Sequence, residues 1–371
     1  MIAGTQCDVL VIGHGASGCL AGAAMAQKGL DVIVVGLGTT ATELSTSRVS
    51  LPEVDRERLV CLFRSVGEGH GLYSSSTGKV PAISCLGTIT TQDLTSAHDW
   101  LASGQMSTAV LGLRGNGCMD PDAVCRSLSR RYPDLECRPL WTDPGVPAEI
   151  GSGNGRTLSE EAQEAVDILC GPLSEVEEDL VVVPPLFSGP LYARALERLE
   201  RASGRHVREP ATPLSVPGRR LQACLEDHVR RSGCRLLKGR EVRRMVFRNG
   251  AATSAVVRSG LREQEIGFRA AVLAIGNLVG GGLTIDGERT CAPIAPLKTC
   301  GQNAGGAPLA SVLSSGLLDQ EMHAVMDDGK TVNNLLVAGS AIAGLSFPLG
   351  RGLGHVASSA LEAAALITEA L

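Results

Sequence analysis

The chain has few aromatic residues: phenylalanine, tryptophan and tyrosine together make up 3% of its 371 residues. Positive charge is not in excess either, because 34 lysines and arginines stand against 39 aspartates and glutamates, a formal net charge of −5 at pH 7. This balance argues against a nucleic-acid partner, since phosphate backbones are bound by dense basic patches. Long apolar runs are also lacking. The longest candidate for a membrane span, residues 9–26, is interrupted by His14 and four glycines.

Cysteine is present, but not in the patterns that hold metals. None of the twelve cysteines forms a Cys-x-x-Cys pair, and the spacings 118/125 and 291/300 are too wide for a usual iron–sulfur or zinc site. We therefore predict no metal site, and we expect most cysteines to be small apolar core residues. Twelve cysteines without a secretory signal predict a reducing compartment, and hence a cytoplasmic protein.

Glycine is abundant, and its most informative use is near the start of the chain. An apolar run at 9–12 leads into Gly13-x-Gly15-x-x-Gly18, a small-residue helix pattern at 19–27 follows, and a second apolar run covers 32–35. Strand, glycine turn, helix and parallel strand form the unit that holds a dinucleotide or flavin phosphate on a helix N-terminus. The predicted cofactor-binding residues of this turn are Gly13, Gly15, Ala16, Ser17 and Gly18.

The carboxylate that usually ends the second strand of such a unit is missing. The strand ends at Gly36, and the next acidic residue is Glu43. An acid at that point normally binds the ribose hydroxyls, so NAD as the sole ligand is disfavoured. Two alternatives remain: backbone or the hydroxyls of Thr39, Thr40 and Thr42 hold the ribose, or the ligand has no adenosine ribose. The second alternative favours FMN, with FAD as the alternative flavin.

A hydroxyl-rich segment, residues 39–48, follows this strand. In flavoproteins the corresponding segment commonly runs past the flavin, where small donors can contact its polar edge. The other interpretation is an ordinary polar surface loop. The candidate cofactor contacts here are Gly36, Thr40, Ser45, Thr46 and Ser47.

The second half of the chain supplies two further buried strands that end in glycine, at 268–276 and 334–340, and a small-residue helix at 355–371. In two-part flavin folds such elements complete the cofactor site, and the last helix directs its N-terminus at the flavin. The candidate binding residues are Gly276, Gly339, Ser340, Gly352 and Gly354. Arg351 and His355 are the candidate catalytic residues, because a cation there would stabilise an anionic reduced flavin or anchor an anionic substrate. The alternative is a solvent-facing arginine and a histidine that starts a helix.

These patterns predict an α/β protein with a Rossmann-like, two-part flavin-binding domain of the glutathione-reductase-like kind. We assign residues 1–54 and 211–371 to that domain, and residues 55–210 to an inserted, smaller α+β lobe that faces the substrate or a partner. Periodic apolar residues predict helices at 55–65, 121–131, 159–169 and 219–229, and Asn249-Gly250 predicts a hairpin turn. His98 and Asp99 are expected to be structural.

Four segments carry a resemblance to a known family: residues 36–47, 210–221, 272–282 and 334–354. In these segments the chain resembles the B-type flavoprotein component of the anaerobic glycerol-3-phosphate dehydrogenase. The resemblance implies a flavin-containing subunit, generally an FMN protein, in a complex that oxidises glycerol 3-phosphate to dihydroxyacetone phosphate. It also implies a catalytic flavoprotein A-like subunit as partner. An iron–sulfur C-like subunit would anchor the pair to the cytoplasmic face of the membrane and pass electrons to quinone. One departure is the arginine and histidine within residues 350–355, which leaves room for a different substrate.

Two other functions are weighed. A stand-alone flavin-dependent reductase or dehydrogenase of the fumarate-reductase kind is disfavoured, because residues 55–210 show no evident set of histidines and arginines to clamp a dicarboxylate. A flavin-free scaffolding subunit is disfavoured by the intact glycines at 13, 15 and 18.

Overall fold

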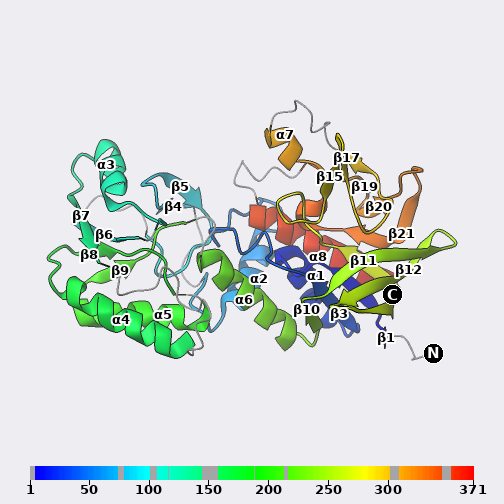
Figure 1. Ribbon diagram of the computed structural model, residues 1–371, viewed down its shortest axis with the longest axis horizontal. Helices are drawn as coiled ribbons and strands as arrows, with labels where there is room; N and C mark the ends of the chain where they lie inside the picture. Colours follow the sequence, from blue (N-terminus) through cyan, green and yellow to red (C-terminus); the bar gives the residue numbers. More distant parts are fainter. Residues whose placement is uncertain are drawn as a thin grey trace. The chain divides into compact units, whose positions relative to one another are not determined.

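A computed structural model describes residues 5–73, 79–100, 107–115, 117–143, 158–187, 189–212, 216–300, 309–344 and 352–371. The chain forms two compact units (Figure 1). The first contains Met1–Ala41, Ser50–Leu59 and Leu225–Leu371, and the second contains Thr42–Val49 and Val60–Cys224. The predicted lobe at 55–210 differs from this second unit at both ends, and its role toward substrate or partner stays a prediction.

The first unit is built on a seven-stranded sheet in the order β10-β3-β2-β14-β21-β20-β19. The first five of these strands run parallel, and β20 and β19 continue the sheet antiparallel. Valine and leucine dominate the central strands, which are buried on both faces as a parallel sheet between two layers requires. The strands are β2 (Val9–Ile12), β3 (Val32–Gly36), β10 (Arg235–Lys238), β14 (Ala270–Leu273), β19 (Asp319–Gln320), β20 (His323–Val325) and β21 (Thr331–Val337).

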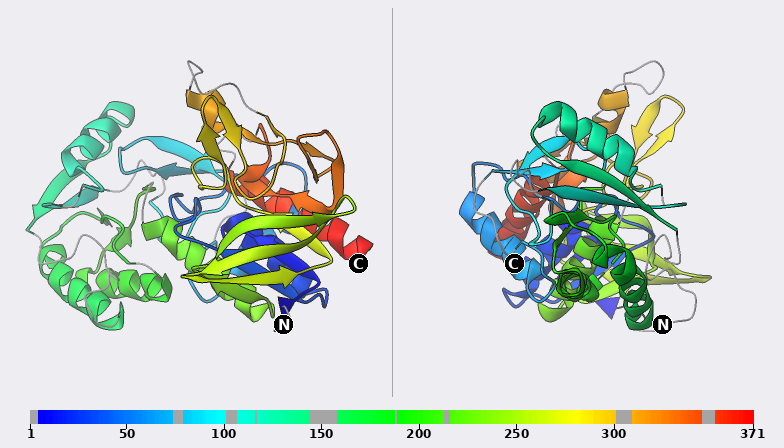
Figure 2. Two further views of the ribbon diagram at one scale, coloured as in Figure 1. Left: turned by 45° about the vertical axis from the view of Figure 1, so that its right-hand side comes forward. Right: turned by 90° about the vertical axis from the view of Figure 1, so that its left-hand side faces the viewer.

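Helices α1 (Ala16–Ala26) and α8 (Gly352–Ala370) pack against each other in this unit (Figure 2). Small residues permit the close approach of α1 to the sheet: a Cβ on Gly22 would lie 2.7 Å from Cγ2 of Val34. Alanines and glycines in the sequence of both helices therefore serve packing at short range, as the small-residue pattern predicts.

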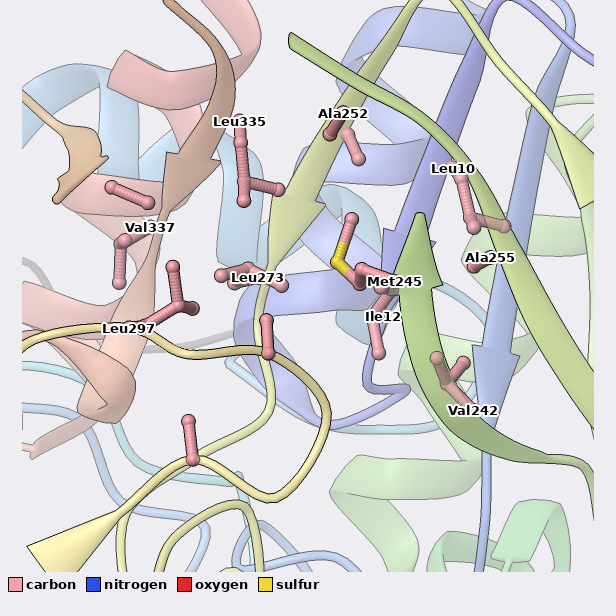
Figure 3. Close-up of a cluster of buried hydrophobic side chains, with 14 of the residues drawn as sticks. Leu10, Ile12, Val242, Met245, Ala252, Ala255, Leu273, Leu297, Leu335 and Val337 are labelled. Atoms are coloured by element: carbon pink, nitrogen blue, oxygen red, sulfur yellow. The ribbon is translucent and has the colours of Figure 1, made fainter. Parts of the chain in front are cut away.

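A second sheet, β1-β13-β12-β11, packs against the first unit's main sheet. Its strands are β1 (Thr5–Gln6), β11 (Glu241–Arg248), β12 (Ala251–Ser259) and β13 (Arg262–Gly267). The predicted hairpin at Asn249-Gly250 is confirmed, with both residues at positive φ. Between the sheets lies an apolar core in which Leu10 and Leu273 meet Met245 (Figure 3). This is the predicted Rossmann-like, two-part architecture.

Shorter elements complete the first unit. They are the hairpin β15 (Thr284–Asp286) and β16 (Arg289–Cys291), the pair β17 (Thr299–Cys300) and β18 (Gly316–Leu317), α7 (Leu309–Leu313) and the 3-10 turn η2 (Gly339–Ala341).

The second unit has its own four-stranded sheet in the order β7-β6-β8-β9, and all neighbouring strands in it are parallel. Helix α3 connects β6 to β7, and α5 connects β8 to β9. Figure 1 shows α3 on one side of the sheet and α4 and α5 on the other. The smaller lobe is therefore organised mainly as α/β, not as the expected α+β, because parallel neighbours need helical crossovers.

The elements of the second unit are β4 (Val80–Ile83), β5 (Ile89–Gln92), β6 (Thr108–Leu113), α3 (Pro121–Arg131), β7 (Cys137–Thr142), α4 (Leu158–Ser174), β8 (Leu180–Val182), η1 (Gly189–Leu191), α5 (Tyr192–Ser203) and β9 (His206–Arg208). The division between the units falls within α2 (Arg56–Gly67) and α6 (Val216–Arg231). The helices predicted at 55–65, 121–131, 159–169 and 219–229 are confirmed as α2, α3, α4 and α6. No helix in the described ranges is both long and apolar enough to span a bilayer.

Candidate functional site

The order of the parallel strands places a switch point between β2 and β14. From β2 the chain proceeds to β3 on one side, whereas β14 and β21 lie on the other side. Ligands of open α/β sheets bind at the carboxyl ends of the strands at such a point. There Gly13 has φ +110°, and a Cβ on it would lie 2.1 Å from the carbonyl oxygen of Ala274. Position 13 therefore accepts only glycine, as the motif predicts.

The next residues form the N-terminus of α1. Gly15 is the N-cap, no side chain caps this end, and the first turn holds no acidic residue. A Cβ on Gly18 would lie 1.9 Å from the carbonyl oxygen of Gly13, so the helix begins directly against the glycine turn. A helix N-terminus of this kind has backbone N–H groups and a partial positive charge that suit a phosphate.

Ser17 lies in the first turn of α1. Its side chain is buried, and its hydroxyl oxygen has no hydrogen-bond partner. Opposite it lies Gly339, at φ +71°, where a Cβ would come within 2.6 Å of Cβ of Ser17. Because an unpaired buried hydroxyl is costly, its position here indicates a ligand that accepts its hydrogen bond.

Gly339 is held by the last helix. Its N–H donates to Oγ of Ser359 at 2.9 Å, and that hydroxyl donates to the carbonyl oxygen of Val356. Ser359 was not singled out in the sequence, since a serine in an alanine-rich helix gives no local sign of a partner twenty residues away.

His14 explains the missing acid at the end of β3. A Cβ on Gly36 would lie 1.8 Å from Nδ1 of His14, a residue that is 3% exposed. The imidazole therefore fills the space into which a ribose-binding side chain at position 36 would project. Sequence reasoning missed this contact, although a large residue between the first two glycines of the motif was a signal for it.

The loop after β14 contributes the predicted Gly276. This residue has φ +81°, and a Cβ on it would lie 3.3 Å from Cα of Gly280 and 3.7 Å from Oγ of Ser340. Asn277 fixes the loop, because its Oδ1 accepts from the N–H groups of Val279 and Gly280. Gly13, Gly276, Gly339 and Ser340 thus lie at one edge of the main sheet, after β2, β14 and β21.

The start of α8 has a packing role in the described structure. A Cβ on Gly354 would lie 2.1 Å from the carbonyl oxygen of Ser50, so glycine there permits close packing of α8. Gly352 and His355 are half-buried in the first turn of this helix. Arg351 lies outside the described residues, so its catalytic role and that of His355 stay predictions.

The hydroxyl-rich segment is divided between the units. Thr40 is buried in the first unit, whereas Ser45, Thr46 and Ser47 belong to the second. Oγ of Ser45 donates to the carbonyl oxygen of Thr42 at 2.7 Å and accepts from the N–H of Ser47. The hydroxyl of Tyr73 donates to the carbonyl oxygen of Ser47. These contacts stabilise a local turn, and a contact of Ser45, Thr46 or Ser47 with a cofactor stays a prediction.

The second unit contains a buried ion pair. Nη2 of Arg220 lies 2.6 Å from Oε2 of Glu209, and its Nε donates to the carbonyl oxygen of Phe187 at 2.7 Å. The guanidinium also lies over the ring of Tyr192, 3.5 Å from its centroid. Burial raises the pKa of the Glu209 carboxyl to about 7, although the neighbouring Arg220 acts in the opposite direction.

A second buried arginine lies in the same unit. Arg48 pairs with Asp99 at 3.3 Å and donates to the carbonyl oxygen of Ile83. The two ion pairs are linked, because Asp99 accepts from the N–H of Ser96 and the Ser96 hydroxyl bonds that of Tyr192 at 2.7 Å. Burial lowers the pKa of His98, whose ring lies edge-on to Tyr192. Three buried polar atoms have no partner in this cluster: Nη2 of Arg48, Nδ1 of His98 and Oε1 of Glu209.

Among the described residues, no group of three histidine, cysteine, aspartate or glutamate side chains is placed to hold a metal ion.

Comparison with known proteins bears on the first unit. Residues 8–57 match the FAD binding domain family. This match covers β2, the glycine turn, α1 and β3, so this part of the first unit is similar to the FAD binding domain family. The expected preference for FMN gains no support from it.

The solved structures that match this chain are distant from it. The chain is 10% identical to 3-ketosteroid delta1-dehydrogenase from Sterolibacterium denitrificans, with a TM-score of 0.47, and the match covers 99% of this chain and 100% of that one. The 3-ketosteroid-delta4-(5alpha)-dehydrogenase from Rhodococcus jostii RHA1 is 11% identical, with a TM-score of 0.42 and coverage of 98% and 97%. A geranylgeranyl bacteriochlorophyll reductase-like protein from Thermoplasma acidophilum is 10% identical, with a TM-score of 0.41 and coverage of 99% and 79%. At this distance these structures carry no argument about substrate or mechanism.

Proposed function

We propose that the chain is the flavin-containing subunit of a dehydrogenase complex that oxidises glycerol 3-phosphate to dihydroxyacetone phosphate. The observation that supports a bound flavin is the α1 N-terminus at the switch point, where the unpaired hydroxyl of Ser17 faces Gly339. The substrate rests on the resemblance of residues 36–47 and 210–221 to the B-type flavoprotein component of the anaerobic enzyme. The bound flavin would supply the acceptor for the two electrons removed from the substrate.

We propose FAD as the flavin, with FMN as the alternative. FAD is supported by the family that residues 8–57 match. The protein's own contribution is to hold the phosphate on the N–H groups of α1, with Ser17 as a further donor. The imidazole of His14, not a carboxylate, would lie beside the ribose.

The proposed partners are a catalytic A-like flavoprotein and an iron–sulfur C-like subunit, and the complex would lie at the cytoplasmic face of the membrane. The support for these partners is the resemblance alone. They would carry electrons from the flavin toward quinone, which makes association with the membrane a property of the complex.

The first experiment identifies the cofactor. The chain is purified, heated, and the released compound is identified by mass; we expect FAD. FMN would change the choice of flavin only, whereas a chain that never binds either flavin would contradict the proposed function.

The second experiment tests the substrate and the partners. The chain is expressed alone and with A-like and C-like subunits, and glycerol 3-phosphate is added with an artificial electron acceptor. We expect little turnover by the isolated chain and turnover by the complex. A complex that forms but never oxidises glycerol 3-phosphate would contradict this substrate.

A stand-alone dehydrogenase is the second candidate, and one observation favours it. The sequence shows no evident set of cations in the lobe, but the fold gathers Arg48, His98 and Arg220 in one buried cluster. Each arginine is already paired with a carboxylate, which is why we rank this candidate second. Robust turnover of a dicarboxylate or of glycerol 3-phosphate by the isolated chain would favour it.

A further inference from the structure

Two cysteines of the second unit lie in direct contact. Cys125 is on α3 and Cys137 is the first residue of β7, and their sulfur atoms are 2.8 Å apart. Both are free thiols. The helix packs against the strand, so the fold itself holds the two sulfur atoms together.

The surroundings of the two sulfur atoms differ. Cys125 is buried among Val124, Leu128 and Trp100 in an apolar cluster, whereas Cys137 is half-buried at the beginning of its strand. Cys137 is therefore the more exposed of the two residues, and a reagent from solvent has better access to it than to Cys125.

The contact also shifts the pKa values of the two thiols in opposite directions. The two sulfur atoms share a hydrogen bond, and when Cys137 is ionised the Cys125 thiol can donate to it, which lowers the pKa of Cys137 and raises that of Cys125. Because the thiolate is the reactive form, the more accessible sulfur is also the more nucleophilic one. An accessible nucleophile beside a buried second thiol is the arrangement of a cysteine pair that forms a disulfide in two steps.

We propose that Cys125 and Cys137 form a reversible disulfide by exchange with a small disulfide such as glutathione disulfide. In the first step the Cys137 thiolate attacks one sulfur of that disulfide, its S–S bond breaks, and one glutathione thiolate leaves. In the second step Cys125 loses its proton to solvent and attacks the Cys137 sulfur, which releases the second glutathione. Two protein thiols are oxidised, and one glutathione disulfide is reduced to two molecules of glutathione.

The bond would join α3 to the edge strand β7 and close a short loop of the chain. A cross-link of this kind restricts the unfolded chain, so we expect the oxidised protein to unfold at a higher temperature than the reduced protein. In a reducing compartment the dithiol form would dominate, and the disulfide would accumulate when the glutathione pool is oxidised. This site is independent of the flavin and of the proposed function.

The experiment uses the full chain in buffers with increasing ratios of glutathione disulfide to glutathione. Free thiols are alkylated, and the protein is digested with trypsin without reduction. Cys125 then lies in peptide 115–126 and Cys137 in peptide 132–156, because Pro139 prevents cleavage after Arg138. The first peptide also contains Cys118, so the test is done in a Cys118→Ser background.

We expect the two peptides to appear joined in the Cys118→Ser protein. Adding Cys125→Ser should replace the joined peptide by a stable glutathione adduct on Cys137, and adding Cys137→Ser should remove both products. Cys170→Ser, a half-buried cysteine on α4, is the matched control and should leave the joined peptide unchanged. Circular dichroism shows whether each variant is folded.

Two results would overturn the proposal. One is a glutathione adduct that persists on Cys137 while Cys125 is intact. The other is a joined peptide that forms only when urea unfolds the chain, since the native contact would then play no part.

Discussion

The imidazole of His14 takes the place that a side chain at Gly36 would need, because a Cβ at position 36 would lie 1.8 Å from Nδ1 of the histidine. The missing acid at the end of β3 and the large residue inside the glycine motif are therefore one feature. The imidazole fits only because position 36 is glycine, and it occupies the space that an acidic side chain at position 36 would need.

This relationship predicts a rescue between two substitutions. Gly36→Ala should lower the free energy of unfolding by about 1–3 kcal/mol, because the added methyl group overlaps a buried ring. In His14→Ala/Gly36→Ala the second substitution should cost much less than it does alone, since the ring is gone. The measurement is urea unfolding of the wild type, His14→Ala, Gly36→Ala and the double variant. Gly171→Ala is the control, because no atom lies within 4 Å of a Cβ there. Strictly additive effects would contradict the contact.

A substitution at Ser17 tests whether its hydroxyl binds a ligand or only stabilises the fold. Ser17→Ala should leave the stability of the flavin-free chain unchanged or raise it slightly, because it removes an unpaired buried hydroxyl. If the hydroxyl donates to a phosphate, flavin affinity should fall by about tenfold or more. Affinity is measured by quenching of flavin fluorescence on titration with the stripped protein.

Ser359→Ala gives the contrasting result. This hydroxyl accepts from the N–H of Gly339, so its loss should destabilise the chain by about 1 kcal/mol whether or not flavin is bound. For Ser17, equal flavin affinity of the wild type and Ser17→Ala would show that its hydroxyl does not bind the flavin phosphate.

Local sequence patterns predicted the elements that depend on interactions between residues close together in the chain. The helix at 121–131 and the Asn249-Gly250 hairpin depend on neighbours within a few residues, and both are confirmed. The glycine turn at Gly13 is also local, and it occupies the switch point.

Contacts between distant residues could not be predicted in this way. Arg48 meets Asp99 across 51 positions, and neither residue stands in a motif. The parallel order of the second unit's sheet was missed for the same reason. Strands β8 and β9 have three residues each, too few to reveal a parallel sheet by their pattern.

The buried pair of Arg220 and Glu209 should depend strongly on both partners. Arg220→Met leaves a buried carboxyl without its cation, and we expect a loss of about 3–5 kcal/mol in the free energy of unfolding. Arg220→Met/Glu209→Gln should recover part of that loss, because no charge remains buried. Arg231→Ala is the control. Its salt bridge with Asp227 is exposed, so the change should stay within about 0.5 kcal/mol. Equal losses in the single and the double variant would show that packing on Tyr192, not charge, is what matters.

The same carboxyl should make stability depend on pH. Burial raises the pKa of Glu209 from 4.5 to about 7 in the folded chain, so the folded state holds this proton more tightly than the unfolded state does. Its contribution to stability is therefore complete below pH 4.5 and is lost as the pH rises toward and through 7. Arg220 and the backbone of Leu186 lower the pKa of this carboxyl, and Asp99 raises it.

Glu209→Gln keeps an acceptor for Arg220 and removes the titration. Between about pH 5 and pH 8 the wild type should lose up to about 3 kcal/mol of stability relative to this variant. His98 acts in the opposite direction, because burial lowers its pKa and its neutral form is favoured as the pH rises. It is present in both proteins, so its effect cancels in the difference. The measurement is urea unfolding at several pH values, and parallel curves for the two proteins would show that Glu209 is ionised throughout.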